Sequence, residues 1–187
     1  MIHLFLACCL VCGGEKGGTM QGPEVSTVVA KERGLASPAV RVVALPAIPG
    51  ATLYRVTVSG EDDSFYTGAV LVAGTLHTDL AGARTAVAKA WGYGAVRTVP
   101  PLSVAQAMVV LMDSEGEPKL IADAAGAEYT RRLGVAGVDV PLEGATDGLP
   151  SVTFWYGTGA NPAQEVILLF HPDFSVEFRN GRAHSGG

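Results

Sequence analysis

The sequence predicts an α+β protein with antiparallel sheet, three or four helices, and a three-stranded meander at the C-terminal end. Segments in which apolar and polar residues alternate occur in neighbouring groups joined by short turns, a pattern typical of β-hairpins. Segments with helical spacing are grouped between these hairpins and do not alternate with single strands, which argues against a parallel sheet. The 187 residues suffice for one domain. We expect it over 23–182, with a division into halves 23–99 and 102–182 left open.

The first half of this body is expected to form a helix, three strands and a second helix. A proline in the first turn and a glycine just past the end delimit the first helix. In the second strand the residues alternate, so that Tyr54 and Val56 share one face while Leu53 and Arg55 share the other. Asp79 is placed to cap the second helix. The predicted elements are a helix over 23–34, strands over 39–45, 51–60 and 65–74, and a helix over 80–91.

The second half begins after Pro100-Pro101 and is expected to contain two helices and the meander. Ser103 with Gln106 three residues later has the pattern of a capping box, and apolar residues continue from there through Met112. The segment 118–122 is compatible with a strand. The remaining predicted elements are a helix over 123–133, a loop over 137–150, strands over 151–157, 164–171 and 174–181, and a disordered tail over 183–187.

The turns and faces of the meander follow from the same pattern. Turn-forming residues over 157–163 separate the first two strands, and Pro172-Asp173 makes a tight link to the last one. In the last strand Val176 and Phe178 are expected to face the core, together with Phe174, while the residues between them face outward.

The charges of the chain bear on its partners. There are 13 basic and 18 acidic residues, which gives a net charge of −5, and no charged residue precedes Glu15. The basic residues are scattered, and Arg131-Arg132 is the only adjacent pair. Proteins that bind phosphate backbones collect their basic residues on one face. Neither nucleic acid nor an anionic membrane surface is therefore an expected partner.

All three cysteines lie in the first twelve residues, within or directly after a run over 2–11 that is apolar except for His3. As a helix this run would span roughly 15 Å, which is too short to cross a bilayer. Its length fits the apolar region of a signal peptide, although no Lys or Arg precedes it. A hydrophilic, glycine-rich segment over 13–22 follows and is expected to serve as a flexible tether.

This N-terminal segment resembles that of bacterial lipoproteins, over roughly residues 1–18 and not in the body. The lipoprotein signal ends in a short box before the cysteine that receives the lipid. Cys9 follows Leu6-Ala7-Cys8, and Cys12 follows Cys9-Leu10-Val11 at the end of the apolar run. The resemblance implies a signal peptide over 1–12, a lipid on Cys12 or Cys9, and a place in the bacterial cell envelope. Cys8 would leave too short an apolar run.

The cysteines admit other interpretations. The spacing of Cys9 and Cys12 is that of a redox pair, but such a pair needs a helix N-terminus after a strand. A zinc site would need a second pair of ligands, and there are no more cysteines. A signal peptide without lipid, which would make the protein secreted, stays open, as does a cytosolic chain with an apolar start.

One polar pattern occurs twice, as His77-Thr78-Asp79 and His171-Pro172-Asp173. Residues two apart on a strand share a face, so each pair can orient an imidazole or offer two metal ligands. The four residues His77, Asp79, His171 and Asp173 are therefore weak candidates for a hydrolase or metal-dependent enzyme. The structural interpretation is that Asp79 caps a helix and Asp173 makes a turn. No cofactor or metal is assigned.

Trp155 and Tyr156 are neighbours on a predicted strand, so one of them is expected to face out of the core. An exposed aromatic residue suits a protein or glycan partner in the envelope. The function predicted from sequence is accordingly a lipid-anchored binding or assembly module on the periplasmic or outer face of the envelope, with no catalytic activity evident. A hydrolase using the two His-x-Asp pairs is the alternative.

Overall fold

A computed structural model describes residues 22–34, 40–45, 48, 50–59, 64–92, 99–158 and 161–183. These residues confirm the α+β class, with four helices and two antiparallel sheets of four and five strands. The signal peptide, the tether up to residue 21, Cys9, Cys12 and the tail from residue 184 lie outside the described residues.

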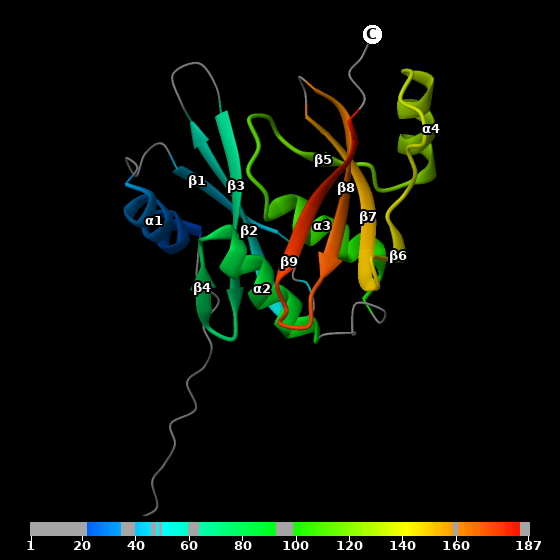
Figure 1. The fold of residues 1–187 in the computed structure, drawn as a ribbon. Coiled ribbons are helices and arrows are strands. Elements are labelled where there is room, and N and C mark those ends of the chain that lie inside the picture. Colours follow the sequence, from blue (N-terminus) through cyan, green and yellow to red (C-terminus); the bar gives the residue numbers. More distant parts are fainter. Residues whose placement is uncertain are drawn as a thin grey trace, which may run out of the picture.

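The first half forms a four-stranded sheet in the order β1-β2-β3-β4. Helix α1 packs on one face of this sheet and α2 approaches the other, next to β3 and β4 (Figure 1). Tyr54 and Val56 lie on the α1 face and Leu53 on the opposite face, as the alternation predicts. The elements are α1 (Gly22–Arg33), β1 (Val40–Ala44), β2 (Ala51–Ser59), β3 (Ser64–Val72), β4 (Thr75–His77) and α2 (Leu80–Trp91).

The second half forms a sheet in the order β5-β7-β8-β9, with β6 also paired to β7. Strands β7, β8 and β9 make the predicted C-terminal meander, and Phe174, Val176 and Phe178 pack against the core. The elements are α3 (Pro101–Val110), β5 (Lys119–Leu120), α4 (Ala124–Arg132), β6 (Leu142–Thr146), β7 (Leu149–Thr158), β8 (Asn161–Phe170) and β9 (Val176–Ala183).

The two sheets share one main hydrophobic cluster, because α2 and α3 lie between them (Figure 1). Leu53 and Val70 contribute to it from the first sheet, and Phe154 and Leu168 from the second. Met108 of α3 is fully buried within it. A smaller cluster lies under α1, and another lies under α4 on the outer face of the second sheet. The halves 23–99 and 102–182 are thus joined by a common core.

Close contacts at the end of α3 join the halves further. An ideal Cβ on Gly68 of β3 would lie 2.2 Å from the carbonyl oxygen of Val110, so the absence of a side chain lets the helix end approach the strand. Just beyond, Tyr66 and Ser114 exchange two backbone hydrogen bonds of 2.8 and 2.9 Å. The residues after α3 in this way pair with the part of β3 that the short strand β4 does not reach.

The predicted loop over 137–150 is wrong in part, because Leu142–Thr146 forms β6 and pairs with β7 through a tight turn at Asp147-Gly148. Both turn residues have positive φ, 54° and 78°. An Asp-Gly pair is a common turn between hairpin strands. The side chains of β6 are mostly exposed, and its sequence shows no alternation of apolar and polar residues. The strand is held in the sheet by its backbone pairing with β7.

Other differences lie at element ends. Helix α3 begins at Pro101 with Pro100 as its N-cap, without a side-chain cap, so the predicted capping box of Ser103 and Gln106 is wrong. Proline fits the first helical position because its missing N–H has no intrahelical acceptor there. The helix ends at Val110, before Met112.

The strand predicted over 65–74 ends at Val72 and turns at Ala73-Gly74 into the short β4, where both turn residues have positive φ. The loop predicted over 157–163 is shorter, since β7 runs to Thr158 and β8 starts at Asn161.

Candidate functional site

The two His-x-Asp pairs have acidic members with local structural roles. Asp79 is the N-cap of α2, and its carboxylate accepts a hydrogen bond of 2.6 Å from the Gly82 amide. His77 ends β4 and lines a shallow pocket against α2, which also contains Lys89. The first pair is therefore divided between a helix cap and the wall of a pocket.

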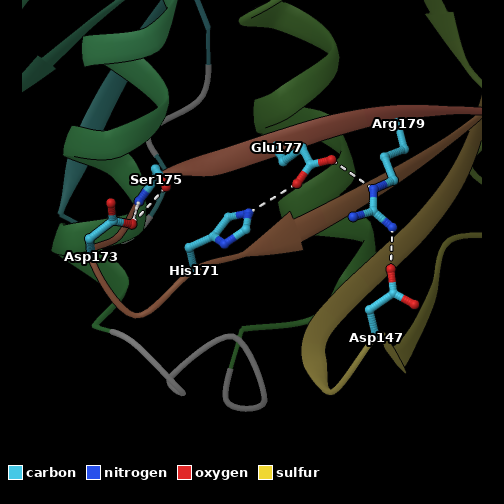
Figure 2. Close-up of polar contacts among 6 residues, drawn as sticks. All are labelled: Asp147, His171, Asp173, Ser175, Glu177 and Arg179. Atoms are coloured by element: carbon cyan, nitrogen blue, oxygen red, sulfur yellow. Dashed lines mark hydrogen bonds and ion pairs between the residues drawn. The ribbon is translucent and has the colours of Figure 1, made fainter.

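Figure 2 shows the second pair, whose members turn apart. Asp173 accepts hydrogen bonds from the backbone N–H of Ser175 at 3.0 Å and from its hydroxyl at 2.6 Å. These hydrogen bonds lower the pKa of the Asp173 carboxyl. The Nε2 atom of His171 lies 3.1 Å from Glu177 instead. Asp173 thus closes the turn between β8 and β9, and His171 is oriented by a different carboxylate.

Glu177 begins a chain of polar contacts that the sequence pattern did not reveal. Its second oxygen accepts a hydrogen bond of 2.7 Å from Nε of Arg179, whose Nη1 also pairs with Asp147 (Figure 2). The hydrogen bonds from Arg179 and His171 hold the pKa of Glu177 below its usual value, and the two carboxylates raise the pKa of Arg179. This series of polar contacts joins the β8–β9 turn to the β6–β7 turn.

This arrangement offers little for catalysis. The Glu177 carboxylate is partly exposed and already engaged by Arg179, whereas a general base needs a free carboxylate or imidazole in reach of a substrate. Within the described ranges no group of three His, Cys, Asp or Glu side chains is placed to hold a metal ion. The contacts stabilise two adjoining turns.

The two aromatic residues proposed for a binding surface both pack into the protein. Trp155 is 2% exposed and lies beneath α4 with Ala127, Val135 and Val138. Tyr156 is on the opposite face and half-buried against the main cluster, and its hydroxyl donates to the side-chain oxygen of Gln164 at 2.8 Å. Burial raises the pKa of Tyr156. Trp155 supports the helix that forms the groove described next.

The groove lies between α4 and the edge of the second sheet, and its volume is about 580 Å³. We call it the α4 groove. Val135 and Ala163 are buried at its base, while Tyr129 of α4 and Leu133, the C-cap residue of that helix, are 65% and 66% exposed. Lys119 of β5 lies on the other side. The groove thus combines two large exposed apolar side chains with a polar edge.

The sequence of α4 explains why this space is unfilled. Ala127 is the one buried residue of the helix, and the small residues Gly126 and Thr130 are among those that line the groove. Asp123 caps the helix through a 2.7 Å hydrogen bond from the Gly126 amide. Glu128 pairs with both arginines at the helix end on the solvent side. Small residues therefore face the sheet, and the longer apolar ones stand at the rim.

Sequence reasoning did not find Tyr129 and Leu133. The spacing of four residues was available as a sign that both lie on one side of the helix. The local sequence does not show that the facing sheet leaves these two side chains uncovered.

Comparisons with protein-family models, with curated proteins and with solved structures find no significant match to this chain. Among the described residues, no helix has the length and apolar character needed to cross a membrane.

Proposed function

We propose that this protein is a non-catalytic binding module, held at the bacterial cell envelope by a lipid on Cys12 or Cys9. The observation that carries the binding role is the α4 groove, with Tyr129 and Leu133 exposed at its rim. Isolated exposed apolar residues are common, but two beside a groove with an apolar base are typical of an interaction site.

The chemistry of the groove suits a protein partner. Aromatic and leucine side chains provide apolar contact area, and polar residues around them exclude water from the contact. Lys119 and Asp123 supply charges of both signs at the edge of the groove. A partner segment with one or two apolar side chains and polar flanks would match this surface.

The anchoring part of the proposal rests on the resemblance of residues 1–18 to lipoprotein signals. A single acyl chain holds a protein to a membrane only marginally, and firm attachment takes two or more. The resemblance implies a multiply acylated cysteine, followed by a glycine-rich tether that leaves the folded body free to reach a partner. The hydrolase alternative is not favoured, because Asp79 and Asp173 are used to cap a helix and to close a turn.

Site-directed photo-crosslinking in intact cells that make the protein tests the groove. A photoreactive residue at Leu133 is expected to give a discrete crosslinked product, and Tyr129→Ser in the same chain should reduce it. The control position is Lys31, an exposed residue of α1 on the far side of the first sheet. Equal products from both positions, or no product from Leu133, would contradict the proposal.

A further inference from the structure

A second pocket lies inside the protein's layers, between the first sheet, α3 and the segment leading into β5. It has a volume of about 390 Å³, within the range of small-molecule sites. We call it the inter-sheet pocket. It shares only Lys119 and Leu120 with the α4 groove. Its apolar lining comes from separated parts of the chain: Leu45, Ile48, Leu53, Val109, Val110 and Leu120.

The charged side chain of Arg55 indicates which kind of ligand would fit this pocket. Arg55 lies on the same face of β2 as the buried Leu53, and its side chain is 27% exposed in the pocket wall. Its Nη1 donates to Glu117 at 2.5 Å. Its Nε is buried and has no hydrogen-bond partner. Of the described residues, Glu117 alone accepts a hydrogen bond from this guanidinium.

The unused donors lie on one edge of the guanidinium. With Nη1 engaged, Nε and Nη2 form the other edge, which matches the two oxygens of a carboxylate. A buried donor without an acceptor is destabilising, so a residue with only a structural role would be expected to have this edge satisfied. The donor capacity of Arg55 exceeds what the described protein groups supply.

The charges around the pocket favour an anion. Arg55 and Lys119 contribute two positive charges and Glu117 one negative charge, a balance of +1 in a chain whose net charge is −5. Gln106 adds an amide at the same wall. The pairing of Tyr66 with Ser114 fixes the loop that carries Glu117 next to Arg55. The anionic group of a ligand would therefore lie at Arg55, with its apolar part toward Leu53 and Val109.

We propose that the inter-sheet pocket binds a small amphipathic carboxylate, with the carboxylate at the guanidinium of Arg55 and the apolar chain among the aliphatic side chains. Glu117 pairs with Nη1 of the same guanidinium, so it holds the side chain in place and partly neutralises its charge. The proposal does not rest on the α4 groove, and the test of one site does not decide the test of the other.

Isothermal titration of the full-length protein with octanoate tests the proposal. Octanoate is expected to bind, whereas acetate lacks the apolar chain and octan-1-ol lacks the charge, so both should bind at least about tenfold more weakly. Arg55→Met removes the cation and should weaken octanoate binding at least about tenfold. Glu117→Gln removes the negative charge that partly neutralises Arg55 and should tighten octanoate binding.

Arg179→Met is the matched control, since it removes a cation on β9 that does not line the pocket. It should leave octanoate binding unchanged. The proposal is overturned if octanoate does not bind, if octan-1-ol binds equally well, or if Arg55→Met binds octanoate like the unmodified protein. If Arg55→Met does not fold, Glu117→Gln decides: tighter binding supports the proposal, and unchanged or weaker binding overturns it.

Discussion

Gly68 shows how a single residue sets the distance between two parts of the fold. The end of α3 approaches β3 so closely that an added Cβ would lie 2.2 Å from the Val110 carbonyl oxygen. Because the Cβ of residue 68 and the Val110 carbonyl group are both fixed by the backbone, neither can move aside without shifting a strand or a helix end. We predict that Gly68→Ala lowers the free energy of unfolding by about 1–3 kcal/mol, as overpacking does. Urea denaturation measures this change.

The control for this prediction is Gly144→Ala on the exposed strand β6. An added Cβ there would meet only the Ser151 hydroxyl oxygen, at 3.4 Å. This variant should unfold at nearly the same urea concentration as the unmodified protein. If the two variants were equally stable, the close approach at Gly68 would not constrain the fold.

The sequence allows two roles for Asp79, a helix cap and a catalytic candidate, and a substitution tests the first of them. Its carboxylate caps α2 through the Gly82 amide. Asp79→Ala should lower the free energy of unfolding by about 0.5–2 kcal/mol, whereas Asp79→Asn should be close to neutral because asparagine caps equally well. Urea denaturation of both variants is the measurement, and an equal loss in both would argue against the cap.

Arg84 acts at the scale of the elements, since it joins α2 to α3 and β9. Its Nε donates to the Leu111 carbonyl oxygen at 2.8 Å, and its guanidinium lies 3.9 Å from the centre of the Phe178 ring. A cation at a helix C-terminus and over an aromatic ring is favourable on both counts. Burial lowers the pKa of Arg84, and Asp113 acts in the opposite direction.

We predict that Arg84→Met lowers the free energy of unfolding by about 1.5–3 kcal/mol, the range for hydrogen bonds to charged groups. Arg84→Lys should recover only part of the loss, because an ammonium lacks the planar guanidinium geometry. Arg132→Met, at an exposed ion pair of α4, is the control and should change stability by less than about 0.5 kcal/mol. An Arg84→Met protein as stable as this control would show that Arg84 does not join these elements.

The turns linked by Arg179 predict a dependence on pH. Hydrogen bonds lower the folded-state pKa of Glu177 from its ordinary value of 4.5 and that of Asp173 from 3.8. A lowered folded pKa gives a stabilising contribution that is present above the unfolded value and is lost as the pH falls through the folded one. Stability should therefore fall as the pH drops below 4.5.

Glu177→Gln should make this acid-side fall in the free energy of unfolding shallower, as measured by urea denaturation at a series of pH values. Glu115→Gln, at an exposed position in the loop after α3, is the control and should follow the unmodified curve. A Glu177→Gln curve parallel to that of the unmodified protein would rule out the proposed contribution.

The elements also show which parts of the fold can be predicted from sequence. The strand β2 was predictable because its two faces pack on different clusters, and its alternation identifies them. The strand β6 was not, because its exposed side chains carry no pattern. The same limit applies to the inter-sheet pocket. The alternation of β2 places Arg55 on the same face as Leu53, as the structure has it. Its partner Glu117 is 62 residues away in the chain, so the local sequence gives no sign of the ion pair.

For the whole molecule, the shared core predicts that the halves do not unfold separately. Side chains of both sheets meet in one cluster around α2 and α3. The two proposed binding sites, the inter-sheet pocket and the α4 groove, adjoin at Lys119 and Leu120 of β5. A body of this kind needs no cysteine to fold, since all three cysteines lie in the first twelve residues.

The proposed function requires that this body is attached to the envelope by a lipid. Mass spectrometry of the N-terminal peptide of the protein, purified from bacterial membranes, tests it most directly. We predict a chain that begins at Cys12 or Cys9 and carries the added mass of its acyl chains. A chain that begins at Met1, or one that is cleaved but unmodified, would contradict the claim.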